Sequence, residues 1–346
     1  MTPHSQYESN LEWCYDAVQD VSRTFAITIS ELDEPMARDI CVGYLVCRVA
    51  DTIEDDDRIP PVEKARLLRS YHRAIDGDED GDGMAFQSEA AEWIPDDPDA
   101  DWQVVANTDR VLSTFYQLEA DARERIRPPV CELVDGMAMF VDRYAAEGGL
   151  RIQTIEELEE YCWYAAGTVG TLVTNLVSQN ADPAVADQLD ENARAFSLLL
   201  QLVNVAKDVA VDYEEENNVY LPEAWLDEAG VTAEDIGAGR SVDALASVVE
   251  RVTDHAAGYL DGGQAWLEAM PERRGNTLAA WAVPYLLAVG TIRELRQRPR
   301  DVFTDGGVKI SREEVYAVIR TFSTGADATD VGRLRRQIAE RPLPEW

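Results

Sequence analysis

The sequence is poor in basic residues. Its 31 lysines and arginines stand against 66 aspartates and glutamates, which gives a formal net charge of -35. A charge of this size repels nucleic acid and anionic lipid, so we exclude a nucleic-acid partner and expect any bound anion to be met by a local cation. Acid spread along a chain is also typical of surfaces that stay hydrated in concentrated salt. We therefore expect a salt-adapted protein, with an acidic protein of ordinary salinity as the alternative.

Cysteine pairs of the C-x-x-C kind are also missing, and the sequence predicts neither a signal peptide nor a membrane anchor. No C-x-x-C occurs, and the five cysteines lie mostly in apolar stretches, which predicts reduced core thiols of a cytoplasmic protein: Cys14, Cys41, Cys47, Cys131 and Cys162. The opening M-T-P-H-S-Q-Y-E has no basic region followed by an apolar run. The longest apolar run, Leu278 to Gly290, is shorter than the roughly 20 residues that span a bilayer. We expect at most peripheral membrane contact.

Alternating strand patterns and internal repeats are absent as well. Apolar residues instead recur at helical spacing near residues 11–20, 34–55, 61–75, 104–125, 129–147, 155–179, 187–213, 241–269, 276–297 and 311–323. Thr154 and Glu157 have the spacing of a capping box at the start of the sixth segment. The pattern predicts an all-α fold and a single helical domain over residues 1–346.

One stretch, residues 76–101, is rich in Asp, Gly and Pro and is predicted to be an acidic loop. Its D-G-D-E-D-G segment, Asp76 to Gly81, matches the first half of a calcium-loop pattern. That pattern requires Glu at position 87, where this chain has Gln87. Because the bidentate carboxylate is missing, we favour a solvated loop over a calcium site.

A narrow polar stripe crosses the apolar segment Y-L-V-C-R-V-A-D-T-I-E-D-D-D, Tyr44 to Asp57. On a helix, Asp51 and Asp55 lie one turn apart on one face, and Arg48 and Tyr44 continue that face backwards. A helix that is apolar on its other sides is expected to turn such a stripe toward an internal cavity. Two carboxylates at this spacing repel each other unless a cation lies between them. The alternative is the acidic end of an ordinary surface helix.

The segment S-L-L-L-Q-L-V-N-V-A-K-D-V-A-V-D, Ser197 to Asp212, repeats this design. Its polar stripe consists of Gln201, Asn204, Asp208 and Asp212, with Lys207 beside it. Facing each other, the two helices would present four Asp carboxylates and an amide oxygen, which suit Mg²⁺ and not zinc. Mg²⁺ bridging carboxylates and a diphosphate would explain how so acidic a chain binds an anion, with the neighbouring arginine and lysine assisting.

Five ordered motifs make the chain resemble the squalene and phytoene synthase family along nearly its whole length. They are S-R-T-F at 22–25, D-T-I-E-D-D at 51–56, Y-C-W-Y-A-A-G-T-V-G at 161–170, Q-L-V-N-V-A-K-D at 201–208 and V-Y-L-P at 219–222. The resemblance is to squalene synthases in particular, in a haloarchaeal-like form. It implies an isoprenoid-synthase helical fold with a central cavity, in which the two Asp-rich helices hold Mg²⁺ and the diphosphates of two prenyl substrates.

The resemblance also implies roles for individual residues. The implied metal and diphosphate ligands are Asp51, Asp55, Asn204, Asp208 and Asp212. The resemblance implies phosphate contacts for Ser22, Arg23 and Arg48 and a pocket-lining role for Phe25. The polar stripes add Tyr44, Gln201 and Lys207 as candidate substrate-binding residues. Tyr161 would lie near the reacting carbons, where it transfers a proton or stabilises a cation. Gly167 and Gly170 either leave room for an isoprenoid tail or allow close helix packing.

Two positions depart from the family pattern. Val211 replaces the Glu that usually precedes the last Asp of the second acidic motif, and Asn218 replaces a basic residue before V-Y-L-P. Both changes bear on the detailed ligand set and leave the aspartate pairs intact.

The implied activity is the head-to-head joining of two farnesyl diphosphates through presqualene diphosphate to squalene, with hydride from NADPH. V-F-T-D-G-G-V-K-I, residues 302–310, resembles a segment near the nicotinamide site of squalene synthases, which makes Lys309 a candidate NADPH contact; a surface Lys after a turn is the alternative. A phytoene or dehydrosqualene synthase without reductant is the rival enzyme, and an acidic metal-binding or scaffold protein is the rival from another class. A monomer is favoured.

Overall fold

The protein is helical throughout the part of the chain that the computed structural model describes. These residues are 3–77, 82–304 and 307–343, without the side chains of Pro3, His4, Arg23 and Asp82. Within these ranges the backbone forms no β-strand, and a single isolated bridge joins Arg151 to Val219. The all-α prediction is confirmed. The chain divides into two compact units, which are described in turn, and the predictions of a single domain and of a central cavity stay predictions.

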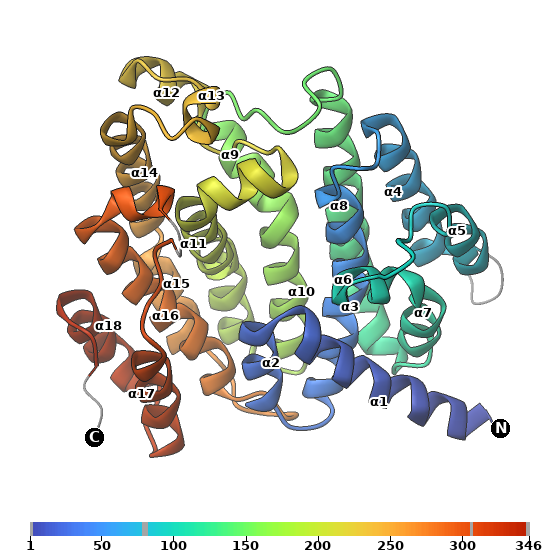
Figure 1. Cartoon of the computed structure of the whole chain (residues 1–346). Coiled ribbons are helices and arrows are strands. Elements are labelled where there is room, and N and C mark those ends of the chain that lie inside the picture. Colours follow the sequence, from blue (N-terminus) through green and yellow to red (C-terminus); the bar gives the residue numbers. More distant parts are fainter. Residues whose placement is uncertain (1–2, 78–81, 305–306, 344–346) are drawn as a thin grey trace. The chain divides into compact units, whose positions relative to one another are not determined.

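The first unit contains residues 1–148, 168–179 and 272–277. Its helices are α1 (Pro3–Val21), α2 (Arg23–Ser30), α3 (Met36–Asp55), α4 (Pro61–Asp76), α5 (Asp82–Ala90), α6 (Ala100–Ala106), α7 (Thr108–Tyr116), α8 (Ala120–Arg143) and α10 (Thr168–Val177). Helix α3 forms the core, because Ile40, Leu45 and Val49 are fully buried where it packs against α6, α7 and α8 (Figure 1). The packing of these apolar sides therefore fixes the direction in which the polar stripe of α3 faces.

Helix α8 passes through two prolines that would ordinarily end a helix. Pro129 has no N–H to donate to the carbonyl of Arg125, one turn earlier. The side-chain amide of Asn175 on α10 donates to that carbonyl at 3.3 Å, and the Arg125 guanidinium donates in return to the Asn175 carbonyl at 3.0 Å. This exchange satisfies the carbonyl and ties α10 to α8.

The predicted loop over residues 76–101 is wrong in part, because it contains helix α5. Phe86 of α5 is fully buried and its ring lies 4.8 Å from that of Tyr71 on α4, so apolar packing overrides the polar composition. Gln87 donates at 2.8 Å to the carbonyl of Ala106 at the end of α6. The residue at the calcium-loop position thus serves packing between helices, while residues 78–81 of that pattern lie outside the described residues.

The second unit contains residues 149–167, 180–271 and 278–346. Its helices are α9 (Ile155–Cys162), the π-helical turn η1 (Trp163–Gly167), α11 (Pro183–Glu216), α12 (Glu223–Ala229), α13 (Ala233–Gly237), α14 (Val242–Ala257), α15 (Leu260–Glu268), α16 (Leu278–Gln297), η2 (Pro299–Phe303), α17 (Arg312–Ser323), η3 (Ala328–Asp330) and α18 (Val331–Glu340). The segments expected as single helices near 155–179 and 241–269 are each interrupted, by η1 and by residues 258–259.

Helix α11 is the centre of the second unit. Asp182 caps its first turn, Pro183 begins it, and Asn217 ends it in a left-handed conformation. It packs against α14, α15, α16 and η1, and its Phe196 ring stacks at 4.2 Å on Trp266 of α15 (Figure 1). These contacts bury all but one face of the helix, which leaves its polar stripe accessible.

The C-terminal helices are joined by a buried ion pair. Arg293 of α16 donates two hydrogen bonds of 2.8 Å to the Glu314 carboxylate on α17, and one of 2.8 Å to the Ile338 carbonyl on α18. Both side chains are almost fully buried. Such a pair holds the three helices in one register, because a shift of any helix would leave a buried charge without its partner, at a high cost in free energy.

Three local expectations can be compared with the structure directly. Cys14, Cys41, Cys47 and Cys162 are buried free thiols, and Cys131 is a half-buried one. Thr154 caps α9 by accepting from the Glu157 N–H, but the Glu157 carboxylate accepts from the Gln153 N–H instead of completing the capping box. In the described chain, α16 is the one helix with the length and composition of a membrane span, yet 78% of that window is buried inside the protein.

Candidate active site

The first acidic motif lies on the polar face of α3. Tyr44, Arg48, Asp51 and Asp55 are all partly exposed, whereas the residues between them are almost entirely buried. The predicted stripe therefore exists as a line of accessible polar groups on an otherwise buried helix.

Arg48 is held between two carboxylates. Its Nε donates at 2.8 Å to Asp101 on α6, and its Nη1 lies 3.9 Å from Asp51. Burial alone would lower the pKa of Arg48, but the hydrogen bond to Asp101 and the charge of Asp51 raise it. Asp101 was missed by the sequence analysis because it stood in the predicted loop; its position in the first turn of a capped helix, after Asp99, is the signal that could have found it.

The positive charges near Asp51 and Asp55 do not fully compensate the negative charges of the two carboxylates. Burial, followed by the neighbouring carboxylates, raises the pKa of Asp51 to about 7, although Arg48 opposes the shift. Burial likewise raises the pKa of Asp55, against the attraction of Arg48 and Lys64. A divalent cation on these oxygens would reverse both shifts, since it favours the charged form. The pair therefore has the chemistry of an incomplete cation site.

Asp56 follows directly in the same motif and behaves differently. It accepts from the indole N–H of Trp102 at 2.9 Å and from the backbone N–H of Arg58 at 2.8 Å. Burial would raise the pKa of Asp56, but its hydrogen bonds and ion pair with Arg58 lower it. This carboxylate is satisfied by the protein and fixes the chain as it leaves α3.

The S-R-T-F motif begins α2 and meets α3. Ser22 is the N-cap of α2 and accepts from the Phe25 N–H at 3.2 Å. The Phe25 ring stacks on that of Tyr44 with centroids 4.0 Å apart, and burial raises the pKa of Tyr44 to about 12. The structure thus brings three predicted residues together, while the side chain of Arg23 lies outside what is described.

The second acidic motif lies on α11 in the other unit. Gln201, Asp208 and Asp212 are partly exposed and Asn204 is exposed, between buried Leu202, Val203, Val205, Ala206 and Val209. Lys207 forms an ion pair with Asp208, its neighbour in sequence. Val211 is 49% exposed, an unusual surface position for a large apolar side chain at the place of the missing Glu.

Tyr161 lies in a buried hydrogen-bonded group within the second unit. Its hydroxyl is 3.1 Å from that of Tyr220, and the Asn218 side-chain amide donates to Tyr220 at 3.1 Å. Asn218 also accepts from the Leu150 N–H at 2.8 Å. Asn218, which stands where the family pattern has a basic residue, is buried and also donates at 3.2 Å to the Glu216 carboxylate. Tyr220 was not predicted as a site residue, because its contact with Tyr161 joins residues far apart in the sequence.

The Y-C-W-Y-A-A-G-T-V-G motif departs from α-helical geometry directly after Tyr161. Residues 163–167 form the π-helical turn η1, a feature that often accompanies functional sites. A Cβ on Gly167 would lie 2.3 Å from the Trp163 ring. Close packing therefore accounts for Gly167, and Gly170 is buried in α10.

Lys309 is an exposed residue between η2 and α17. Arg298 donates at 2.9 Å to its backbone carbonyl and at 2.9 Å to Glu294, which anchors the segment to α16. Part of the 302–310 segment lies outside the described residues.

The donor chemistry fits Mg²⁺, although the described residues contain no group of three or more His, Cys, Asp or Glu gathered as a metal cage. The candidate ligands are carboxylate and amide oxygens, which are hard ligands. Asp51 and Asp55 belong to the first unit, and Asn204, Asp208 and Asp212 to the second. The two sets of candidate ligands are therefore described separately, each within its own unit.

Comparison with known proteins gives one consistent result. The model of the family described as squalene/phytoene synthase matches residues 18–314. The chain is 26% identical over 315 residues to the squalene synthase of Schizosaccharomyces pombe, covering 90% of this chain and 64% of that protein. It is 24% identical to squalene synthase 1 of Arabidopsis thaliana, covering 92% and 73%. A relative named inactive squalene synthase 2, also from Arabidopsis thaliana, is 26% identical, covering 82% and 64%.

Solved structures share the fold. A complex of TcSQS with the ligand BPH1237 superposes with a TM-score of 0.76 at 22% identity, covering 96% of this chain and 98% of that one. A dehydrosqualene synthase in complex with ligand has a TM-score of 0.65 at 18% identity, covering 93% and 98%.

Proposed function

The chain belongs to the squalene/phytoene synthase family, and on that basis we propose that it joins two molecules of farnesyl diphosphate head to head, through presqualene diphosphate, to form squalene. Membership alone does not carry this proposal, because a relative of similar identity is named inactive. The residues of this chain have to support it.

The observation that carries the proposal is the electrostatic state of the first acidic pair. Asp51 and Asp55 lie one turn apart on α3, are only partly exposed and have raised pKa values, while the carboxylate of Asp56 beside them pairs with Arg58 and accepts from the Trp102 indole N–H. Holding two like charges one turn apart with little access to water is unfavourable, and a bound cation would relieve this cost, which supports a cation-binding role for the pair. A scaffold protein would have no such need, and its acids would lie on exposed faces.

Asp51, Asp55, Asn204, Asp208 and Asp212 would hold Mg²⁺, which when bound would neutralise the diphosphate leaving group. Arg48 would bind phosphate oxygens, since Asp101 and Asp51 fix its guanidinium. The Phe25 and Tyr44 rings would line the substrate pocket and exclude water from the reacting carbons. Tyr161, oriented by Tyr220 and indirectly by Asn218, would hold or move a proton near the developing cation.

Squalene rather than dehydrosqualene is the proposed product because the relatives named above are squalene synthases and because the 302–310 segment carries Lys309. Lys309 is exposed in a strongly acidic chain, a suitable position for a cation that meets the phosphate of NADPH. A dehydrosqualene or phytoene synthase, which needs no reductant, is the second candidate, favoured by the shared fold of a dehydrosqualene synthase.

Product analysis tests the proposal. The protein is incubated with farnesyl diphosphate and Mg²⁺, with and without NADPH, and the hydrocarbons are identified by mass spectrometry. We expect squalene with NADPH and presqualene diphosphate without it. Dehydrosqualene or phytoene formed at the same rate in both samples would favour the second candidate, and no conversion under either condition would favour a binding protein.

We further propose that the protein acts as a monomer in the cytoplasm of a salt-adapted cell, with at most peripheral membrane contact. Fractionation of the native cells tests the location: recovery in an integral membrane fraction that resists high salt and alkali would contradict it.

A further inference from the structure

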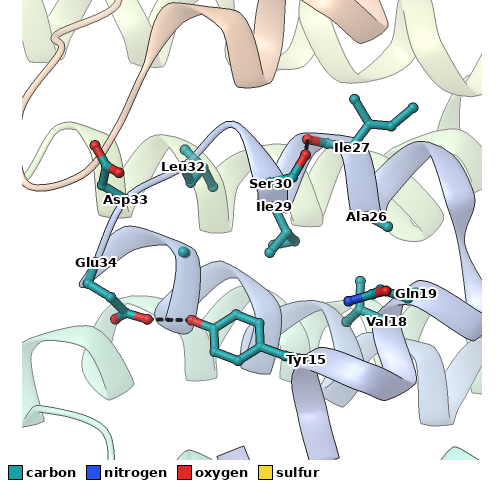
Figure 2. A pocket seen from close by; sticks show the side chains of 11 residues that line it. Tyr15, Val18, Gln19, Ala26, Ile27, Ile29, Ser30, Leu32, Asp33 and Glu34 are labelled. Carbon is teal, nitrogen blue, oxygen red and sulfur yellow. Dashed lines mark hydrogen bonds between the residues drawn. The ribbon is translucent and has the colours of Figure 1, made fainter. Parts of the chain in front are cut away.

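A cavity of about 840 Å³ opens within the first unit (Figure 2). It lies between α1, the C-terminal half of α2, the turn from α2 to α3 and the first residues of α3. None of the residues assigned above to substrate or metal lines it.

The walls of this cavity are mainly apolar. They are formed by Val18, Ala26, Ile27, Ile29, Leu32 and Ala37. In Figure 2 the side chains of Val18, Ile29 and Ala26 turn toward the same space between α1 and α2. A space of this size and lining suits the chain of a small molecule, and each methylene that it buries would tighten binding by about fourfold.

The polar groups of the cavity give it negative charge. Asp33 and Glu34 line it from the turn, and the Tyr15 hydroxyl donates to Glu34 at 2.5 Å. Among the described residues, no Lys or Arg lies within ion-pair distance of either carboxylate; the nearby Arg38 is paired with Asp39 at 2.8 Å.

The acidic turn is held in place before any ligand arrives. The Asp33 N–H donates at 2.8 Å to the Gly275 carbonyl, and the Thr277 hydroxyl donates at 2.6 Å to the Glu31 carbonyl. The Ala37 N–H donates at 3.0 Å to the Asp33 carbonyl. A turn fixed from both sides loses little entropy when it binds a ligand.

We propose that this cavity is a binding site for a small amphiphilic cation, an alkyl chain that carries an ammonium group. The chain would lie along the apolar wall of α1 and α2, and the ammonium would meet Asp33 and Glu34. The same carboxylates would repel a prenyl diphosphate, so this site is distinct from the substrate site and its ligand is not the substrate.

Calorimetric titration with three ligands of equal chain length, octylamine, octan-1-ol and octyl phosphate, below their micelle concentrations, tests the proposal. We expect saturable binding of one octylamine per chain, about fivefold weaker binding of the alcohol, and no binding of the phosphate. The preference for the amine over the alcohol should shrink in concentrated KCl, because the charges at the mouth are exposed.

Variants separate the two parts of the site. The double variant Asp33→Asn, Glu34→Gln should bind amine and alcohol equally, whereas Asp16→Asn, an exposed acid of α1 outside the cavity, should leave the preference unchanged. Ala26→Trp should fill the space and abolish binding of both ligands, with circular dichroism confirming the fold. Equal binding of amine and phosphate by the unaltered protein, no saturable binding, or full binding by the Ala26→Trp variant would overturn the proposal. None of these results depends on catalytic activity.

Discussion

The acids of the D-T-I-E-D-D motif divide into two kinds at the level of single residues. Asp56 is satisfied by Trp102 and Arg58 and contributes to the fold. Asp51 and Asp55 have raised pKa values because the protein buries them with too little positive charge nearby. Residues that a fold does not need for packing, and that cost it stability, are those expected to serve function.

The first prediction concerns substitutions of these acids. Asp51→Asn and, on α11, Asp208→Asn should each lower kcat by a factor on the order of 100 or more, because each removes a charge that stabilises the departing diphosphate. Asp51→Asn should leave helicity intact and raise the free energy of unfolding by about 0.5 kcal/mol, since it relieves repulsion. Steady-state kinetics and urea denaturation measure the two effects.

Asp56→Asn is the matched control within the same motif. It should lower the free energy of unfolding by about 1 kcal/mol, because it weakens hydrogen bonds to Arg58 and Trp102. Its kcat should fall far less than that of Asp51→Asn. Near-normal turnover of Asp51→Asn at limiting Mg²⁺ would show that the ligand assignment is wrong.

The second prediction concerns the reductant. Lys309→Ala should raise the KM for NADPH about tenfold, through the loss of one charge-assisted hydrogen bond, and should spare the formation of presqualene diphosphate, which needs no hydride. Arg320→Ala, which removes an exposed cation of α17, is the control and should change neither step. Equal slowing of both half-reactions by Lys309→Ala would refute a specific NADPH contact.

At the level of elements, the region around Tyr161 depends on the π-helical turn. The Trp163 ring packs so closely on Gly167 that a side chain at position 167 would clash with it. The same ring also contacts the Arg194 guanidinium, which lies 5.2 Å from the ring centroid. The turn therefore couples the packing of η1 against α11 to the position of Tyr161 at the end of α9.

The third prediction is that Gly167→Ala destabilises the protein by about 1–3 kcal/mol, because the new methyl group must displace the Trp163 ring or the turn. Gly83→Ala is the control. There the methyl would meet only the end of the Leu112 side chain, at 3.3 Å, so we expect a much smaller change in the free energy of unfolding. Urea denaturation measures the free energy of unfolding of both variants. An unchanged free energy of unfolding in Gly167→Ala would contradict the packing explanation.

The sequence predicted four helices well because their apolar periodicity and their burial agree. Helices α3, α4, α16 and α17 begin and end within two residues of the predicted bounds. The segments expected near 104–125 and 129–147 are wrong, since the chain there forms α6, α7 and one helix α8 over Ala120–Arg143. Periodicity did not reveal α5, whose Phe86 is buried by tertiary packing. It also did not reveal the break at 258–259 or the π-helical turn, because a local pattern does not encode which neighbour a side chain meets.

The sequence predicted which acidic residues share a helix face, but it did not predict which residues contact them. The spacing of Asp51 and Asp55 placed them on one face, but Asp101 is contributed by another helix and forms no pattern with them. Tyr220 and Asn218 likewise act through contacts with Tyr161 and Leu150 that lie 59 and 68 residues away in sequence. Such long-range contacts follow only from the fold.

The whole molecule is dominated by its charge of -35. We predict that its melting temperature rises by several degrees between about 0.1 M and 1 M KCl, where the Debye length falls from about 10 Å to about 3 Å and self-repulsion is screened. A variant in which four exposed acids, Glu12, Asp16, Asp20 and Glu250, are replaced by their amides should show a smaller rise. A melting temperature that falls with KCl would contradict the salt-adapted interpretation.

The central proposal is that the aspartates of α3 and those of α11 are each needed to bind prenyl diphosphates through Mg²⁺. Isothermal titration with a farnesyl diphosphate analogue that cannot ionise tests it most directly. The account predicts two analogue molecules per chain in the presence of Mg²⁺, none when the metal is removed by chelation, and a loss of tight binding in both Asp51→Asn and Asp208→Asn. Binding that is unchanged by chelation, or that survives both substitutions, would contradict it.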